Sequence, residues 1–141
     1  MEPGTCIAAW TAVDAADEEN GGLMVVPRSN GLDIECPHEA DPNVSFTTDE
    51  VTVPEGMPVI PVNMAAGDVL FFNGSIIHGS YPNQSADRFR RAFICHYTGA
   101  STSRIGKYYK PLFDAAGNEV DIESNTDSGP CGVEYAAMGP H

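Results

Sequence analysis

Short runs of apolar residues, separated by turn signals, recur along this chain. Residues 5–13 alternate loosely between apolar and polar positions and predict a strand. Residues 23–26 continue the pattern after an Asn-Gly-Gly turn, until Pro27 ends it. Residues 69–72 form a continuous apolar run, which is typical of a strand buried on both faces. Residues 89–97 alternate again and predict a further strand, with a helix over 87–95 as the alternative.

The remaining segments are shorter or more polar. Residues 51–53 and 59–62 predict two short strands around a Pro-Glu-Gly turn. Residues 28–50 predict a long irregular loop, of the kind that serves as a lid or a substrate wall. No repeat and no long helical period occurs. We therefore expect a mainly β sandwich or barrel over residues 1–120, followed by a polar tail over residues 121–141.

Composition and charge narrow the possible partners. The 141 residues suffice for one domain, and the formal net charge is -13. A surface of that sign repels phosphate backbones and anionic lipid, so we expect no nucleic-acid and no membrane partner. No apolar stretch approaches the ~20 residues of a spanning helix, and no signal peptide is visible. The four cysteines, Cys6, Cys36, Cys95 and Cys131, show no metal or redox spacing and predict reduced thiols in a cytoplasmic protein.

One histidine stands where it could bind a metal. His78 follows the Ile76-Ile77 pair and precedes Gly79-Ser80, at the expected mouth of the sheet. An imidazole there could ligate Fe(II), Zn(II) or Mn(II). The alternative is a hydrogen-bonded histidine at a strand end.

Three of the seven basic residues of the chain, Arg88, Arg90 and Arg91, gather before the last long strand. A guanidinium can hold a carboxylate through two hydrogen bonds, so one of them could bind a small diacid. Since neighbouring strand residues face opposite sides, at most one of Arg90 and Arg91 enters the pocket. The alternative is a set of solvated arginines on an acidic surface.

Other possible metal ligands lack a suitable arrangement. His38 and Asp41 lie in the irregular loop at a spacing that does not fit an HxD pair, and we expect them to be solvated. His96 and Cys95 are neighbours in a strand and cannot share a metal. No nucleophile elbow, phosphate-binding glycine loop or HExxH motif occurs.

Four stretches together resemble the C-terminal part of the phytanoyl-CoA dioxygenase-like family of Fe(II)- and 2-oxoglutarate-dependent oxygenases. They are AAWTAVDAADEENGGLMVVPRSN, AAGDVLFFNGSIIHGSYPN, DRFRRAFICHY and, more weakly, KPLFDAAGNEV, and they span most of residues 8–120 in the family's order. The resemblance implies a double-stranded β-helix, a cupin-like jelly-roll barrel with the metal at one mouth.

The resemblance also assigns roles to residues. His78 corresponds to the distal iron-binding histidine, and Arg90 to the arginine that holds the distal carboxylate of 2-oxoglutarate. Ser80 is a plausible helper of Arg90. Trp10 and the ENGGL turn match positions that shape the cofactor pocket, although Trp10 could equally be a core residue. The spacing from His78 to Arg90 is about one residue long for the family, which leaves Arg88 as a lesser candidate.

The chain departs from the family at its start. The other two iron ligands of the family come from an HxD motif that precedes the TCIAAW segment, and this chain begins at Met1, after that motif. Arg28 and Asn30 stand where the family usually has a glycine and a histidine. We therefore expect an incomplete barrel that binds Fe(II) and 2-oxoglutarate poorly and is inactive alone. Exposed strand edges and apolar surface then predict a homo-oligomer.

Three functional hypotheses follow. The first is a truncated oxygenase whose intact relatives hydroxylate a small organic substrate that the sequence does not identify. The second is a non-catalytic jelly-roll that binds a small anion or assembles. The third is a different metal-dependent β-barrel with isomerase or storage chemistry, which would need further inward histidines or glutamates that the sequence does not supply.

Overall fold

Short strands make up nearly all of the regular structure. The computed structural model describes residues 6–33, 35–41, 43, 49–106 and 109–125. In these residues the helical structure is limited to the 3₁₀ turn η1 (Ser29–Gly31) and one further 3₁₀ position. The expectation of a mainly β fold is confirmed, and the helical alternative for residues 87–95 is wrong.

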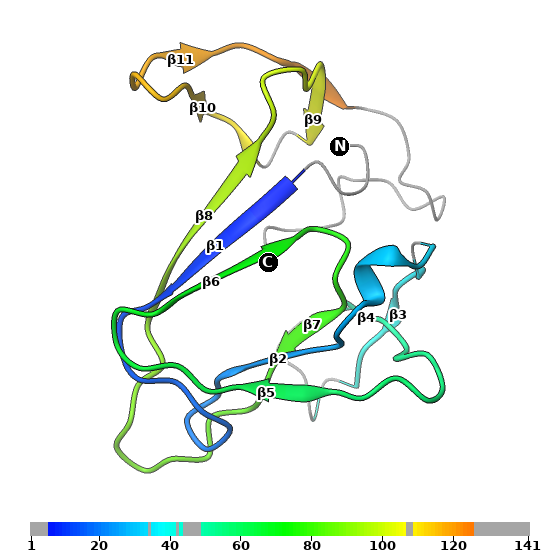
Figure 1. Cartoon of the computed structure of the whole chain (residues 1–141), viewed down its shortest axis with the longest axis vertical. Coiled ribbons are helices and arrows are strands. Elements are labelled where there is room, and N and C mark those ends of the chain that lie inside the picture. The colour runs from blue at the N-terminus through cyan, green and yellow to red at the C-terminus, as the bar shows by residue number, and fades with distance from the viewer. Residues whose placement is uncertain (1–5, 34, 42, 44–48, 107–108, 126–141) are drawn as a thin grey trace.

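The first sheet has three antiparallel strands in the order β6 (Val69–Asn73), β1 (Cys6–Ala12) and β8 (Ala92–Thr98) (Figure 1). Trp10 in the central strand lies opposite Leu70 on one side and Ile94 on the other. The strand expected over residues 89–97 begins only at Ala92. Side chains from other segments bind the backbone just before it, as described below.

The second sheet is also antiparallel and has the order β5 (Ile60–Val62), β2 (Leu23–Val25) and β7 (His78–Ser80). From β5 to β8 the chain alternates between the two sheets, so neighbours in sequence lie in different layers (Figure 1). This is the winding of a jelly roll, and the expected double-stranded β-helix is confirmed. In the described part of the chain the sheets do not close, and β8 and β7 are edge strands.

A small core lies between the two sheets. Trp10 is only 2 % exposed and packs with buried residues from both layers, namely Ala12, Ala16, Leu23 and Met64. Leu70 and Phe72 of β6 pack against this cluster. The alanines of β1 leave room for the indole ring, which explains why one tryptophan can fill the space between the layers. The sequence alternative of Trp10 as a core residue is therefore confirmed.

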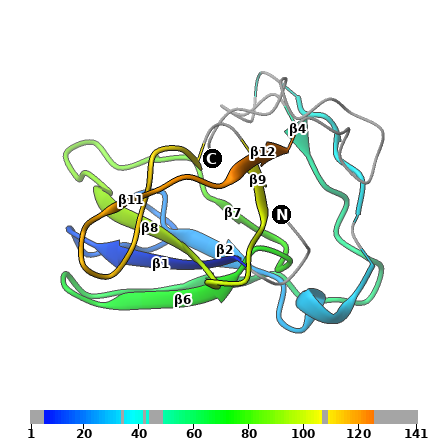
Figure 2. The same ribbon diagram turned by 90° about the horizontal axis from the view of Figure 1, so that it is seen from above.

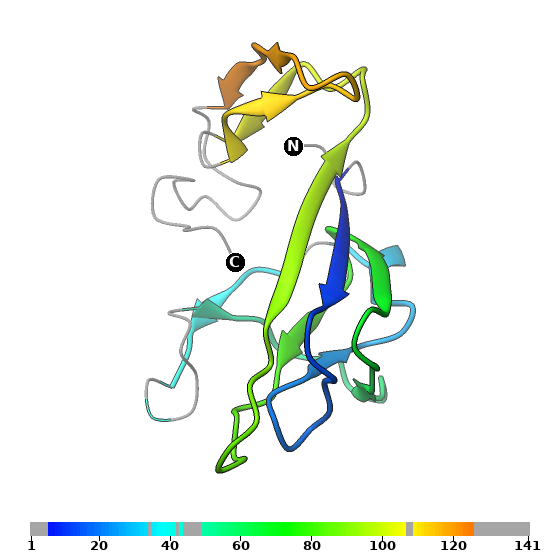
Figure 3. The ribbon, with the colours of Figure 1, turned by 90° about the vertical axis from the view of Figure 1, so that its left-hand side faces the viewer.

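The remaining strands form three two-stranded pairs. β3 (His38–Glu39) pairs with β4 (Asp49–Glu50), β10 (Leu112–Phe113) with β11 (Glu119–Val120), and β9 (Arg104–Gly106) in parallel with β12 (Glu123–Asn125). Figure 3 shows β9 to β12 gathered beyond the end of β8, and Figure 2 looks onto this end of the molecule. Residues 51–53, which were expected to form a strand, follow β4 as irregular chain.

The segment expected as a tail begins with a paired strand, β12, while residues 126–141 lie outside the described part of the chain. The domain boundary at residue 120 stays a prediction. Cys6 and Cys95 are free thiols, but Cys36 is disulfide-bonded, so the expectation of reduced thiols is wrong for Cys36. Sequence spacing does not reveal which cysteines meet in space. Among the described residues, no helix has the length and apolar character to cross a membrane.

Candidate anion site beside the second sheet

Two of the three clustered arginines are occupied by carboxylates of the protein itself. Arg88 donates to Asp17 at 2.7 Å and to Glu19 at 3.0 Å. The Arg91 guanidinium donates two hydrogen bonds, of 2.7 and 2.8 Å, to the Asp14 carboxylate. The Arg91 hydrogen bonds lower the pKa of Asp14 to about 2. Arg88 is therefore an unsuitable clamp for an external anion, and so is Arg91.

Arg90 is held differently. Its Nε donates to the backbone carbonyl of Gly21 at 2.7 Å, and its Cζ lies 5.8 Å from the ring centroid of Trp10. No carboxylate in the described part of the chain forms an ion pair with Arg90, in contrast to Arg88 and Arg91. Because Nε is already bonded, the guanidinium is oriented while its two terminal nitrogens keep their donors for a ligand.

A pocket of about 320 Å³ lies next to Arg90. Its lining combines a loop that follows β1 with a loop that follows β7, and consists of Asn20, Gly21, Tyr81, Pro82, Asn83 and Arg90. The two loops are joined by backbone hydrogen bonds, including one of 3.0 Å from the Tyr81 amide to the Gly22 carbonyl. Arg90 supplies the only formal charge in this lining, so the pocket favours a small anion.

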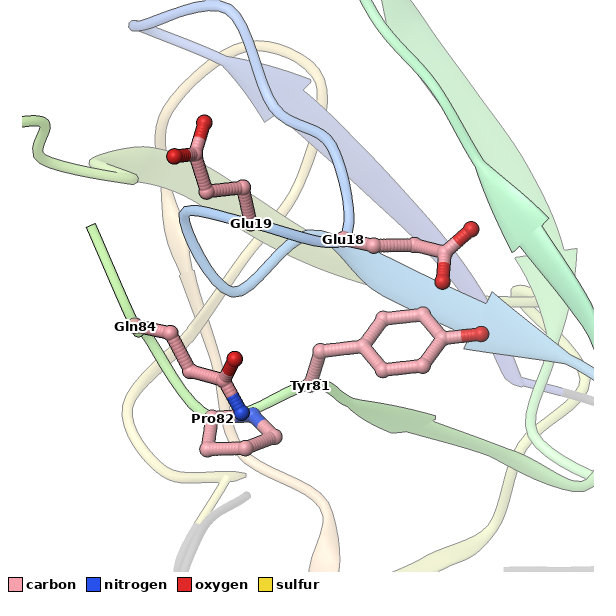
Figure 4. A pocket seen from close by; sticks show the side chains of 5 residues that line it. All are labelled: Glu18, Glu19, Tyr81, Pro82 and Gln84. Carbon is pink, nitrogen blue, oxygen red and sulfur yellow. The ribbon is translucent and has the colours of Figure 1, made fainter.

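An adjacent pocket has the opposite charge. It shares Tyr81 and Pro82 with the first and is otherwise lined by Glu18, Glu19 and Gln84. Figure 4 shows the Glu18 and Tyr81 side chains extending to the same side, away from Glu19 and Gln84. Burial, with a smaller contribution from Glu18, raises the pKa of Tyr81. An anion is repelled here, which distinguishes this pocket from the one beside Arg90.

His78 lies on the second sheet, opposite Val25 of β2. Its Nδ1 is 2.9 Å from the Ile76 carbonyl, and its ring stacks at 4.7 Å on Phe72 with a tilt of 54°. A carbonyl can only accept, so the proton of the neutral ring sits on Nδ1 and the lone pair on Nε2. This is the arrangement found in metal-binding histidines, whose second nitrogen is fixed by a backbone partner.

Strand register relates His78, Ser80 and Arg90 to one another. His78 lies opposite Val25 and Ser80 opposite Leu23, and Leu23 belongs to the core around Trp10. The side chains of His78 and Ser80 therefore face the space between the sheets. The Arg90 guanidinium lies over Trp10 of the same core. Ser80, however, is not in the lining of the pocket beside Arg90.

A complete metal site is not present among the described residues. No group of three or more His, Cys, Asp or Glu side chains comes together there. The His38 ring of β3 bonds to Thr52, just after β4, at 3.0 Å, and the Asp41 carboxylate accepts from the Asn43 backbone amide at 2.8 Å. His96 packs edge-on against Tyr109. His78 alone therefore does not fit a resident Fe(II), which needs several ligands.

Sequence reasoning missed the importance of Asn20. The Asn-Gly-Gly signal predicted a turn, and the turn forms, but the asparagine side chain is buried rather than exposed. The Asn20-Gly21-Gly22 pattern does not separate a buried asparagine from an exposed one, although an amide, with two donors and an acceptor, can join several segments by hydrogen bonds.

Comparison with known proteins gives concordant matches. The family model "Phytanoyl-CoA dioxygenase (PhyH)" matches residues 1–92. A probable phytanoyl-CoA dioxygenase of Caenorhabditis elegans is 34% identical over 100 residues, covering 68% of this chain and 31% of the relative. The peroxisomal phytanoyl-CoA dioxygenase of Rattus norvegicus is 33% identical over 104 residues, covering 70% and 30%. The chain thus spans about a third of the length of these relatives.

A solved structure matches the fold. It is the crystal structure of SnoN, a non-heme alpha ketoglutarate dependent epimerase from nogalamycin biosynthesis. The TM-score is 0.52 at 19% sequence identity, and the match covers 94% of this chain and 50% of that one.

Proposed function

The chain belongs to the phytanoyl-CoA dioxygenase family, and from this premise we propose that it carries the 2-oxoglutarate-binding part of an Fe(II)- and 2-oxoglutarate-dependent oxygenase. Family membership supports an oxygenase-like function. The chain covers only part of its relatives, so the activity of a whole oxygenase, hydroxylation of a small organic substrate, is part of this proposal.

The observation that supports the proposal most is the state of Arg90. Of the three clustered arginines it alone has no described carboxylate partner, and it is oriented by Gly21 above Trp10. The distal carboxylate of 2-oxoglutarate would bind its two terminal nitrogens, as guanidinium and carboxylate geometries match. Ser80 would assist from the inner face of β7, and His78 would supply one iron ligand through Nε2.

Iron in such a site supplies oxygen activation, but no three metal-binding side chains come together among the described residues. We therefore propose that this chain alone binds Fe(II) poorly and 2-oxoglutarate weakly. Anaerobic addition of Fe(II) and 2-oxoglutarate should produce no visible charge-transfer band. A band that disappears in His78→Ala would contradict this part of the proposal.

Isothermal titration with 2-oxoglutarate tests the clamp. Binding on the order of millimolar is expected for the wild type, because one charge-assisted anchor acts in an open pocket. Arg90→Ala should weaken binding about 10- to 100-fold, the effect of hydrogen bonds to a charged group. Arg91→Ala is the matched control and should retain binding, since Arg91 is occupied by Asp14. Loss of binding in Arg91→Ala alone, or no wild-type binding, would refute the assignment.

A second candidate is a non-catalytic jelly-roll that binds a small anion. It is favoured by the incomplete ligand set around His78. This candidate predicts the same affinity for 2-oxoglutarate with and without Fe(II), whereas the oxygenase proposal predicts tighter binding when the metal and its missing ligands are supplied. Titrations with and without Fe(II), on this chain fused to a family segment that carries the HxD motif, separate the two.

We also propose that the protein forms a homo-oligomer. The outer face of the first sheet exposes large apolar side chains, with Phe71 67 % and Phe93 64 % exposed, next to Ile7 and Tyr97. Beside them β8 presents a seven-residue edge. An antiparallel β8–β8 pair about a two-fold axis is self-complementary. It would pair this edge and bring the outward side chains of β8 in the two copies together.

We further propose a cytoplasmic location, which the free thiols of Cys6 and Cys95 support and the disulfide at Cys36 opposes. Alkylation of a fresh cell lysate followed by mass spectrometry would decide. Modified Cys36 supports the cytoplasm, and unmodified Cys36 in an oxidised peptide refutes it.

A further inference from the structure

The segment just before β8 owes its shape to side chains from other parts of the chain. Residues 88–91 have no strand pairing. Instead the Arg88 carbonyl accepts from Asn83 at 2.9 Å, and the Phe89 carbonyl accepts from Asn20 at 3.0 Å. The Arg91 amide donates to Asp14 at 2.9 Å. Arg90 is thus presented by an irregular backbone whose path is set by hydrogen bonds.

We propose that Asn20 is a positioning residue, which orients the Arg90 guanidinium for its ligand. The proposal rests on the function assigned to Arg90 above. Asn20 is 1 % exposed, which is unusual for an amide side chain, and it lies far from Arg90 in sequence.

All polar atoms of the Asn20 side chain are used. Its Nδ2 donates to the carbonyl of Ala15 at 2.7 Å and to that of Phe89 at 3.0 Å. Its Oδ1 accepts from the Asp17 amide at 2.8 Å. Two donors and an acceptor at these positions require an amide, because a carboxylate cannot donate and a hydroxyl has a single proton.

The same turn holds Arg90 at a second point. Asn20 binds the carbonyl of the residue before Arg90, and the next residue in the turn, Gly21, accepts from the Arg90 Nε at 2.7 Å. The two contacts close a ring that runs through the Asn20 side chain, the Arg90 backbone and the guanidinium. Within such a ring the direction of the guanidinium is fixed from both ends, which lowers the entropy lost when an anion binds.

The groups that fix Arg90 are neutral, and a comparison with the two neighbouring arginines explains why. Arg88 and Arg91 are fixed by carboxylates, which neutralise them. Asn20 and the Gly21 carbonyl fix the backbone and guanidinium of Arg90 without adding a formal charge. The positive charge of Arg90 therefore stays available to the pocket.

Nitrogen-proton spectra of the arginine Nε groups test the proposal without any ligand. Arg90→Lys and Arg91→Lys assign the two signals. In Asn20→Ala the Arg90 Hε should shift and exchange with water about tenfold faster or more, as expected when a hydrogen bond loses its support. The Arg91 Hε, bonded to Asp14 at 2.8 Å, is an internal control and should not change. Asn118→Ala, which removes an exposed amide bonded to Asp114, is the matched control variant.

Titration with 2-oxoglutarate adds a second readout. Asn20→Ala should weaken binding, and the double variant with Arg90→Ala should bind no worse than Arg90→Ala alone, because both act through one group. An unchanged Arg90 signal in folded Asn20→Ala overturns the positioning role. A changed signal with no wild-type 2-oxoglutarate binding supports the positioning role and refutes the proposed function instead.

Should Asn20→Ala not fold, the wild type alone is decisive. Both Asn20 Nδ2 protons and the Arg90 Hε should then exchange slowly with water, as buried hydrogen-bonded groups do. Rapid exchange of the Asn20 amide would refute the proposal.

Discussion

Replacement of Gly22 by alanine is expected to destabilise the protein and to loosen the anion site. A Cβ at this position would lie 2.7 Å from the carbonyl oxygen of Asp17, 2.9 Å from its amide nitrogen and 3.0 Å from its carbonyl carbon. Ordinary carbon contacts are about 3.5–4.0 Å long. All three clashing atoms belong to the backbone, so no side chain can rotate away to relieve them.

The clash would disturb a turn whose backbone makes several hydrogen bonds. The Gly22 amide donates to the Asp17 carbonyl at 2.6 Å, and its carbonyl accepts from the Tyr81 amide at 3.0 Å. Overpacking of this kind costs about 1–3 kcal/mol. For a domain of this size that corresponds to a fall in melting temperature of roughly 3–12 °C. Gly21, which precedes Gly22, accepts the hydrogen bond from the Arg90 Nε, so the affinity for 2-oxoglutarate should fall as well.

Thermal unfolding followed by circular dichroism is the assay, with Gly31→Ala as the matched control. A methyl group at Gly31 would have no atom within 4 Å, and the backbone of Gly31 is outside the left-handed region. That variant should stay within about 0.5 kcal/mol of the wild type. Equal stability of Gly22→Ala and Gly31→Ala would refute the reasoning, since it would mean that the turn relaxes freely around the added methyl group.

Three further outcomes are expected. Arg91 lowers the pKa of Asp14 from 3.8 to about 2, so the contribution of Asp14 to folding stability is complete above pH 3.8 and is lost as the pH falls through 2. The urea midpoint of the wild type should therefore drop more steeply with acidification than that of Asp14→Asn. Parallel curves would exclude this contribution. Light scattering should report an oligomer that dissociates in Phe93→Lys, whereas a monodisperse wild-type monomer would remove the case for self-association. Burial raises the pKa of the Cys6 thiol, so iodoacetamide should modify Cys6 more slowly than the less buried Cys95; equal rates would show that β1 opens readily.

The strands that could be predicted are those with a strong local pattern of apolar and polar residues. The runs around β1, β2, β6 and β8 alternate or are continuously apolar, and each forms a strand within a few residues of the expected position. The family resemblance is likewise confirmed by the match over residues 1–92. The alternation around Arg90 and Arg91 correctly separated the two side chains, although neither residue lies in the strand itself.

What the sequence could not indicate depends on contacts between distant segments. Arg88, Arg90 and Arg91 look alike in a one-dimensional pattern. Only the positions of Asp14 and Asp17, more than seventy residues away, show which guanidinium is left for a ligand. The late start of β8 has the same origin, because the side chains of Asp14, Asn20 and Asn83 bind the backbone of residues 88–91.

The central place of β1 in its sheet has a consequence for biosynthesis. β1 is the first strand of the described chain, yet it pairs with β8, whose last residue is Thr98. Its partner on that side therefore leaves the ribosome some ninety residues later. Until then, one flank of β1 and the Trp10 ring lack their final neighbours, and a chain with such high contact order is expected to mature slowly and to depend on chaperones against aggregation.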